Sequence, residues 1–473
     1  MITFYIENFG CRATEADASA MRRELLARGL ALTSEHTSAD VVVLNTCTVT
    51  AAADSQAREA VRKIHRANPG ARIIVTGCYA QRAPEELAAL EGVEWVIGNS
   101  HQWEIPRLIA ASGLQRAETY AGISSVRAPS HVDPAESATD FVPLTQISDD
   151  TMSLARGAAK ILTGDIFAQS TVQIAGVDSL AGSSSGDRTR PILKIQDGCN
   201  NRCSYCVIPF VRGRSRSVPP DVVIDEVRQL HSAGVKEIVL SGINLGSYGR
   251  DLTPRAALVN FVHRILDETL IDQIRFSSIE PQDVTEDFVS LVAGSPRLAP
   301  HFHVPLQSGS DRILRAMHRW YRTEHYAERI SMVRRLLPDA AIGADVIVGF
   351  PGESDDDFRA TREFIERLPF TYLHVFSFSA RPGTAADQFG DAVPPAEIRG
   401  RARVLRTLGQ KKSAEFRASL ARRSLRALTL NRRGSDWTEA LTGNYLKVRV
   451  PGLHPANEWY QVCLTVDEAA AVA

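Results

Sequence analysis

Three cysteines lie within eight residues directly after an apolar, strand-like run, and this arrangement restricts the fold more than any other feature. The segment reads DGCNNRCSYCVIP, in which Cys199, Cys203 and Cys206 follow the run ILKIQ with Cys-x3-Cys-x2-Cys spacing. Thiols grouped in one loop are typical of a metal centre rather than of buried structural cysteines. A zinc site would need a fourth ligand, and no neighbouring cysteine or histidine supplies one. A tight turn with incidental thiols is the structural alternative.

Three thiolates on a four-iron cluster leave one iron without a protein ligand. Such an iron can bind the amino and carboxylate groups of S-adenosylmethionine and pass an electron to its sulfonium, which generates a 5′-deoxyadenosyl radical. With Tyr205 directly before the third cysteine, the loop resembles that of the radical S-adenosylmethionine superfamily. We therefore expect Cys199, Cys203 and Cys206 to hold a redox-active [4Fe–4S] cluster.

Strand-like runs and helical patterns alternate after Pro191, with strand candidates ILKIQ, EIVLSG, IRFSSI, HFHVPL, AIGADVIVG and LHVFSF. This number of parallel strands fits a partial (β/α)6 barrel better than a complete eight-stranded one. Enzymes of this architecture carry their chemistry at the carboxyl ends of the strands. The candidate cofactor-binding residues follow these strands and are Tyr205, Ser241, Gly242, Asn244, Glu280, Gln307 and Gly349.

Cys11, Cys47 and Cys78 are far apart in the chain but occupy equivalent places. They end YIENFGC, VVVLNTC and RIIVTGC, each a strand-like run that precedes a helical pattern. The carboxyl ends of parallel strands meet at one edge of a sheet, beside helix N-termini that favour negative charge. The pattern predicts a second [4Fe–4S] cluster on three cysteines. Three half-buried cysteines, or a zinc site without an obvious fourth ligand, are the alternatives, and Cys463 is expected to be an ordinary strand residue.

Composition excludes several classes of protein. Seven cysteines in a chain that starts MITFYIENFG, which is unlike a signal peptide, argue against a disulfide framework. No run of 18 apolar residues predicts a membrane span, and we expect a cytoplasmic protein without membrane contact. The net charge of −1 shows no general bias towards nucleic acid, but Ala396 to Arg433 contains twelve Lys or Arg against two Glu. That stretch is either an RNA-binding segment or a solvated helical face.

Periodicity divides the chain into four parts and predicts an α/β fold. We expect an N-terminal parallel α/β sheet domain at residues 1–120 and a linker or insertion at 121–190, where Ser, Ala and Gly dominate. A barrel is expected at 191–410 and a small β-barrel at 411–473.

Together these motifs resemble the methylthiotransferase family of radical S-adenosylmethionine enzymes over nearly the whole chain. The blocks HVPLQSGSDRILRAMHR, GADVIVGFPGES and VFSFSARPGTAA are similar to family blocks. The segment TGNYLKVRV resembles the Asn-Tyr signature of the family's RNA-binding C-terminal barrel, the TRAM domain. The resemblance implies two [4Fe–4S] clusters, S-adenosylmethionine and a tRNA anticodon stem-loop as substrate. It also implies a sulfur donor and an electron donor such as flavodoxin or ferredoxin.

The family has three branches. The segments NTCTVTAAADSQAR, QDGCNNRCSYCVIPFVRGRSRS, LSGINLGSYGRDL and SSIEP are most similar to the branch that acts on N6-threonylcarbamoyladenosine at position 37 of tRNA. The other branches act on isopentenyladenosine-37 or on an aspartate of a ribosomal protein. They usually show Ser-Ile-Arg or Gly-Phe where this chain has Thr48, Val49 and Thr50.

The implied reaction places a methylthio group on C2 of adenosine 37. One S-adenosylmethionine methylates sulfur held at the N-terminal cluster, and a second supplies the radical that removes hydrogen from C2. A non-catalytic iron–sulfur RNA-binding protein is the alternative of a different class, and two clusters with open irons argue against it.

The candidate RNA-binding residues lie in two basic segments. They are Arg212, Arg214, Arg216, Lys411, Lys412, Arg422 and Arg423. The three arginines directly follow the central cysteine loop and suit RNA phosphates and structural ion pairs equally well.

Overall fold

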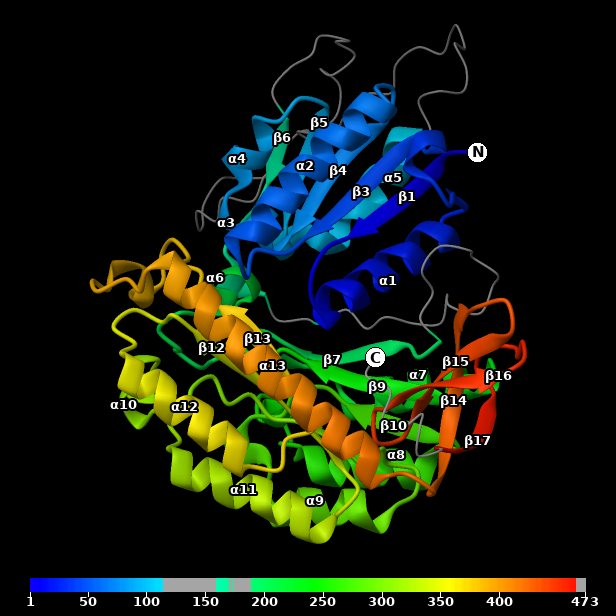
Figure 1. The fold of residues 1–473 in the computed structure, drawn as a ribbon. Coiled ribbons are helices and arrows are strands. Elements are labelled where there is room, and N and C mark those ends of the chain that lie inside the picture. Colours follow the sequence, from blue (N-terminus) through cyan, green and yellow to red (C-terminus); the bar gives the residue numbers. More distant parts are fainter. Residues whose placement is uncertain (114–158, 170–171, 173–188, 465–473) are drawn as a thin grey trace, which may run out of the picture.

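The computed structural model describes residues 1–113, 159–169, 172 and 189–464, which form three units built on β-sheets (Figure 1). Most of the predicted linker, residues 121–190, lies outside the described residues. No helix in the described ranges is long and apolar enough to cross a membrane.

The N-terminal unit is a parallel sheet with strand order β2-β1-β3-β4-β5-β6. Its strands are β1 (Thr3–Asn8), β2 (Ala31–Leu32), β3 (Val41–Thr46), β4 (Arg72–Gly77), β5 (Val93–Gly98) and β6 (Lys160–Leu162). Its helices are α1 (Arg12–Ala27), α2 (Ala51–Ala67), α3 (Cys78–Arg82), α4 (Pro84–Ala88) and α5 (Ile105–Gly113). Helix α2 packs on one face of the sheet, and α1 and α5 pack on the other. Because both faces are covered, β3 is buried along its whole length, as its continuous apolar run predicts.

Strand β6 differs from the predicted organisation. It lies within the range expected to be a linker, yet it pairs in parallel with β5 and completes the N-terminal sheet, with Trp95 opposite Lys160. The two units are therefore not separated at residue 120. With only three residues, β6 is too short to give a visible periodic pattern in a polar segment.

The central unit is the expected partial barrel. Its six parallel strands match the six predicted runs and are β7 (Ile192–Asp197), β9 (Glu237–Gly242), β10 (Gln273–Phe276), β11 (His301–His303), β12 (Ala341–Val348) and β13 (Tyr372–Ser377). A short strand, β8 (Arg216–Ser217), adds to β7 in antiparallel orientation. The order is β10-β9-β7-β8 in one sheet and β11-β12-β13 in the other, and parallel bridges such as Ser278 with His303 join the two.

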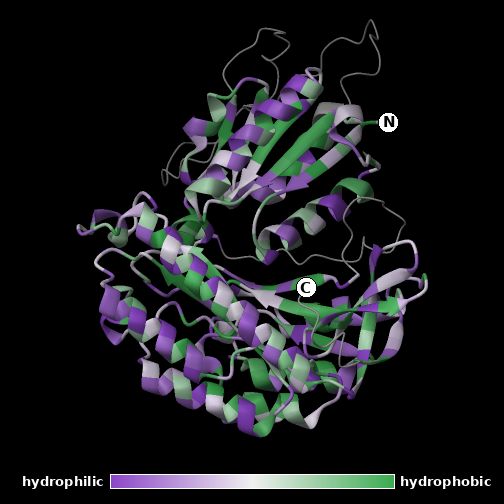
Figure 2. Ribbon diagram, in the orientation of Figure 1, coloured by the Kyte–Doolittle hydropathy of each residue, from purple (hydrophilic) through white to green (hydrophobic). Residues whose placement is uncertain are grey.

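Helices surround the barrel strands in alternation with them. They are α6 (Ile208–Arg212), α7 (Pro220–Ser232), α8 (Leu258–Glu268), α9 (Glu286–Gly294), α10 (Asp311–Ala316), α11 (Thr323–Leu336), α12 (Asp355–Arg367) and α13 (Pro395–Ser419). Figure 2 shows apolar residues concentrated in the strands and hydrophilic residues on the helices.

Helix α1 joins the N-terminal unit to the barrel. Its residues Ala16 and Ala20 form a small apolar cluster with Ile192 of β7 and Val239 of β9. The small alanine side chains allow the helix to lie directly on the barrel strands. The N-terminal unit therefore sits over one side of the partial barrel (Figure 1).

The C-terminal unit is a curled antiparallel sheet with order β16-β15-β14-β17. Its strands are β14 (Ser424–Arg433), β15 (Trp437–Thr442), β16 (Lys447–Pro451) and β17 (Trp459–Cys463). The expected boundary at residue 411 falls inside α13, which continues to Ser419.

A buried arginine fastens this sheet to the amino ends of the barrel strands. Arg275 donates to Glu237 at 2.7 Å and to the carbonyls of Thr442 and Gly443 at 3.2 and 2.8 Å. Arg275 and Glu237 are both fully buried. Burial raises the pKa of Glu237, but Arg275 and Arg190 outweigh this effect and lower it overall.

Replacing Arg275 tests how much this contact contributes to the stability of the protein. We expect Arg275→Leu to destabilise the protein by about 3–5 kcal/mol, because Glu237 keeps its charge in a buried place. The midpoint of urea unfolding followed by circular dichroism measures the change. Arg359→Leu removes the exposed pair with Asp356 and should shift stability by less than about 1 kcal/mol. Equal shifts in the two variants would contradict this role of Arg275.

Candidate active site

The central cysteine loop depends on a close backbone contact. Gly198 has φ of +71°, and a Cβ atom there would lie 2.0 Å from the carbonyl oxygen of Arg214. The amide of Cys199 donates to the carbonyl of Gly213 at 3.1 Å. Only glycine fits this crossing, which folds the loop back at the carboxyl end of β7.

Donors surround the sulfur atoms of this loop. Arg319 donates to Cys203 Sγ at 3.2 Å, and the Asn201 amide donates to Cys199 Sγ at 3.4 Å. Burial, followed by the charges of Cys203 and Cys199, raises the pKa of Cys206 to about 12. An iron cluster would offset both effects because it binds thiolates and displaces their protons. The donor set therefore fits a cluster with three cysteine ligands.

Two residues that were predicted to bind the cofactor, Asn244 and Glu280, lie beside this loop. Asn244 Nδ2 lies 4.0 Å from Cys199 Sγ, and Asn244 Oδ1 is buried without a partner among the described residues. Glu280 forms an ion pair with Arg319, whose other nitrogen faces Cys203. Burial raises the pKa of Glu280, and Arg319 opposes this shift. The unpaired amide oxygen of Asn244 is a free acceptor for a ligand amino group.

The other predicted positions divide into two groups. Tyr205 and Gln307 line a cavity described below. Ser241 is buried within β9, and a Cβ on Gly242 would lie 2.8 Å from the side-chain oxygen of Gln196. Gly349 has φ of +78°, and a Cβ there would lie 2.4 Å from the side chain of Ile398 on α13. Packing therefore accounts for the two glycines.

The N-terminal cysteines are brought to one edge of their sheet, where β1, β3 and β4 end. Gly10 has φ of +116°, and a Cβ there would lie 2.5 Å from Cys47 Cβ and 3.0 Å from Cys47 Sγ. Gly77 has φ of +99° and leaves no room for a Cβ beside the backbone of Thr46. Both glycines directly precede a cysteine, and they let the two loops approach Cys47 closely.

Burial and mutual charge repulsion raise the pKa values of the buried thiols at this site, as they do in the central triad. Burial, with the charges of Cys78 and Cys11, raises the pKa of Cys47 to about 12. Burial also raises the pKa of Cys78, whereas Arg212 and Asn99 act to lower it. Cys11 is exposed whereas Cys47 and Cys78 are buried, so the site has one open side.

The sulfur separations disfavour a single metal ion. Tetrahedral zinc with Zn–S bonds of ~2.3 Å places its sulfurs about 3.8 Å apart. In the described part of the chain, neither cysteine triad has its ligand atoms all within 4.8 Å of one another. In a four-iron cluster each cysteine binds a different iron, so the ligands lie farther apart. Both triads therefore fit clusters better than zinc.

A buried ionic network joins the N-terminal unit to the barrel. Arg212 of α6 contacts Asp17 of α1 at 2.8 Å and Asp197 of β7 at 3.1 Å. Lys194 of β7 bonds both carboxylates, at 2.8 Å to Asp197, and Arg216 lies 3.9 Å from Asp197. Burial acts to raise the pKa of Asp197, but the charges of Arg212 and Lys194 lower this pKa well below its usual range. Sequence reasoning missed Asp17 and Lys194, although a lysine in the apolar run ILKIQ was a signal.

A second buried contact connects the units near Cys47. Arg381, in the loop after β13, donates to Thr48 Oγ1 at 3.0 Å and pairs with Asp54. Arg82 pairs with the same carboxylate at 3.1 Å. This contact fixes the loop that follows Cys47 against the carboxyl end of the barrel.

Three of the seven predicted RNA contacts are wrong. Arg212 and Arg216 are buried in the ionic network, and Lys412 is buried with its ammonium bonded to the carbonyls of Glu366 and Leu368. The ion-pair alternative therefore holds for the two arginines. The predicted contacts that remain exposed are Arg214, Lys411, Arg422 and Arg423.

A cavity of about 210 Å³ lies between the central cysteine loop and the loop that follows Cys47. Val49 and Thr50, which follow Cys47, form one wall, and Cys206 lies in another. The remaining lining residues are Tyr205, Val207, Ile208, Gln307, Asp345, Ile347, Phe376, Ser377, Phe378 and Ser379. A ligand in this cavity touches the surroundings of both triads.

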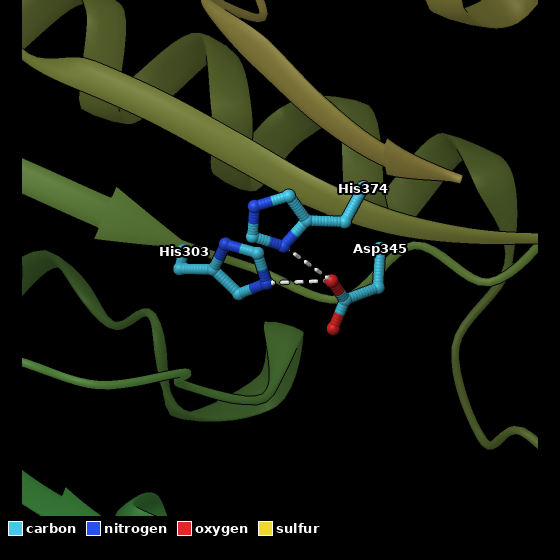
Figure 3. Close-up of side chains that lie close together, drawn as sticks. All are labelled: His303, Asp345 and His374. Atoms are coloured by element: carbon cyan, nitrogen blue, oxygen red, sulfur yellow. Dashed lines mark hydrogen bonds and ion pairs between the residues drawn. The ribbon is translucent and has the colours of Figure 1, made fainter. Parts of the chain in front are cut away.

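Next to the cavity, three side chains from adjacent strands converge (Figure 3). His303 Nε2 and His374 Nδ1 lie 3.0 and 3.2 Å from the same oxygen of Asp345. Sequence reasoning missed this group because its members lie within strands, far apart in the chain.

Family models match two parts of the chain. Residues 3–98 match the model described as uncharacterized protein family UPF0004, and residues 193–365 match the radical SAM superfamily. A solved structure of TsrM, a radical S-adenosylmethionine methyltransferase from Kitasatospora setae, has a TM-score of 0.53. It covers 79% of this chain and 72% of that chain at 16% identity, which supports the fold alone.

Curated relatives match most of the chain. Over 458 residues it is 34% identical to the threonylcarbamoyladenosine tRNA methylthiotransferase MtaB of Aquifex aeolicus, covering 97% of this chain and 99% of that one. The protein of that name from Bacillus subtilis is 34% identical, covering 83% of this chain and 77% of its own. A tRNA-2-methylthio-N(6)-dimethylallyladenosine synthase of Syntrophobacter fumaroxidans is 36% identical, with shares of 82% and 76%. The chain therefore belongs to the methylthiotransferase family of radical S-adenosylmethionine proteins.

Proposed function

We propose that this protein is an enzyme that adds a methylthio group to C2 of N6-threonylcarbamoyladenosine at position 37 of tRNA. The observation that carries the proposal is the cavity whose walls include Cys206 and the residues that follow Cys47. A carbon atom held there lies beside Cys206 and beside the residues that follow Cys47, which suits a reaction that uses both triads. The relatives from Aquifex aeolicus and Bacillus subtilis bear the name of this activity.

Two [4Fe–4S] clusters and S-adenosylmethionine are the proposed cofactors. Cys199, Cys203 and Cys206 would hold one cluster, and Cys11, Cys47 and Cys78 would hold the other. When bound, these groups supply the radical that opens the C–H bond and the sulfur that is transferred.

The chain's own residues position the reactants. Arg319 neutralises charge at Cys203 and fixes Glu280, and the free acceptor of Asn244 would orient the amino group of S-adenosylmethionine. Ile347 and Phe378 give the cavity apolar walls. Such walls accept a planar base and exclude water, which protects a reactive intermediate.

RNA binding is proposed for the exposed cations Arg214, Lys411, Arg422 and Arg423. Arg214 lies in the crossing beside the central triad, and Arg422 and Arg423 precede the C-terminal sheet. Exposed cations at these places would contact backbone phosphates of an anticodon stem-loop and set its register. A sulfur donor and an electron donor such as flavodoxin or ferredoxin complete the proposed partners.

Isopentenyladenosine-37 is the second candidate substrate, because the relative from Syntrophobacter fumaroxidans is named for the dimethylallyl derivative. Analysis of tRNA nucleosides distinguishes the two candidate substrates. We expect tRNA from cells that lack this gene to lose the 2-methylthio form of threonylcarbamoyladenosine and to accumulate the unmethylthiolated form. Liquid chromatography with mass spectrometry measures both.

Complementation provides the control for this experiment. Wild-type protein and Cys463→Ala should restore the modification, since Cys463 ends β17 in the C-terminal unit. Cys199→Ala should not restore it. If the threonylcarbamoyl nucleosides did not change while the isopentenyl series lost its methylthio group, the second candidate would replace the first.

Iron content tests the two cluster sites separately. After anaerobic reconstitution we expect about eight irons per chain, as two four-iron clusters require. The triple variant Cys11→Ala, Cys47→Ala, Cys78→Ala should retain about half of the iron, and Cys463→Ala should retain all of it. A triple variant that kept the full iron content would show that the N-terminal site is assigned wrongly.

A further inference from the structure

The group formed by His303, Asp345 and His374 faces the proposed reaction cavity through its carboxylate. Both imidazoles approach one oxygen of Asp345, and in Figure 3 the other oxygen points away from the two rings. Asp345 lines the cavity together with Cys206 and Gln307. Burial opposes ionisation of Asp345, but the two histidines lower its pKa well below the usual range, so the carboxylate stays charged.

A hydrogen-bond chain uses both nitrogens of His303. The Tyr372 hydroxyl lies 2.7 Å from His301 Nε2 and 3.0 Å from His303 Nδ1. His301 is buried, and burial with the charge of Arg275 lowers its pKa, so its ring is neutral. The assignment that satisfies this chain has His301 donating to Tyr372, Tyr372 to His303 and His303 to Asp345. His303 therefore has no nitrogen left for a ligand.

His374 differs from His303 because one of its nitrogens remains open. Its Nδ1 bonds Asp345, and Nε2 has no partner among the residues that the structure describes. The His374 side chain is 51% exposed, compared with 7% for His303. Asp345 thus fixes the ring with Nε2 left open, so that Nε2 accepts from an N–H or O–H group in the neutral ring and donates to an anion in the protonated ring.

The edge strand β13 connects His374 to the cavity. Tyr372, His374 and Phe376 alternate along it and so share one face. Phe376 lines the cavity and remains 44% exposed. A base stacked on Phe376 would extend its exocyclic substituent along this face towards His374.

We propose that His374 forms the subsite for the N6 substituent of the target adenosine and binds its carboxylate, with Asp345 as the residue that positions His374. This inference rests on the proposed function and names the residues that would select its substrate.

The chemistry of the substituent explains why such a subsite would be selective. A threonylcarbamoyl group carries a carboxylate, a hydroxyl and ureido N–H groups, which pair with His374 and the free oxygen of Asp345. A hydrocarbon substituent such as isopentenyl would cover the same charged groups without pairing them. Polar groups that a ligand covers without pairing are penalised far more strongly than a missing apolar contact.

Binding to two synthetic anticodon stem-loops tests the subsite. One RNA carries N6-threonylcarbamoyladenosine at position 37 and the other carries adenosine, and fluorescence anisotropy gives Kd for reconstituted protein under anaerobic conditions. We expect the wild type to prefer the modified RNA by about 10-fold or more, the value of one or two charged hydrogen bonds. His374→Phe should reduce the preference to less than about 3-fold without changing the Kd for the adenosine RNA.

Matched variants control for indirect effects. His263 is an exposed histidine on α8, and His263→Phe should keep the full preference. His374→Gln retains an N–H donor and should recover part of it. If His374→Phe fails to retain iron, His374→Gln decides the question.

The outcomes separate the subsite from the proposed function. A wild type that methylthiolates the modified RNA while His374→Phe keeps the same preference overturns the subsite alone, as do equal wild-type Kd values for the two RNAs. A wild type that does not act on the modified RNA overturns the proposed function. One equivalent of a metal besides the cluster iron, lost in His374→Phe, would make the histidines and Asp345 metal ligands and would also overturn the subsite.

Discussion

The active site depends on a pair of carboxylates buried between α1 and β7. Asp17 and Asp197 face the buried side chains of Lys194, Arg212 and Arg216. Arg212 also acts on the buried thiol of Cys78 and lowers its pKa against the effect of burial. The network therefore favours a thiolate, or a cluster bound to it, at the N-terminal triad. One network thus holds the two units together and prepares the site that lies between them.

The sequence allowed the main strands to be located because buried parallel strands are uninterrupted apolar runs. It also located both cysteine triads, since a thiol at a strand end reaches the functional edge of the sheet whatever the loop length. Residues whose role depends on a distant partner could not be found in this way. His374 and Asp345 each belong to an ordinary strand, and only the register of β12 with β13 places them side by side.

Charge along the chain was a poor guide to exposure. Arg212 and Arg214 are two residues apart in one basic run, yet one is 2% exposed and the other lies on the surface. The short helix α6 turns Arg212 inward, and the following crossing at Gly213 turns Arg214 outward. The Asn-Tyr segment of the C-terminal unit also makes a contact within the protein. Tyr445 stacks on His301 with centroids 4.2 Å apart, so in this chain the segment docks the sheet onto the barrel.

Strand β6 has a consequence for how the chain tolerates changes in length. The chain leaves the N-terminal sheet at α5 and returns to the edge of the same sheet at Lys160, where β6 is held by β5. The two ends of this connection are therefore fixed by the N-terminal sheet. Closing a flexible loop becomes costlier only with the logarithm of its length, by about 0.6 kcal/mol for each doubling. Related chains can thus lengthen or shorten this connection at little thermodynamic cost, and the distance between the two cysteine triads stays the same.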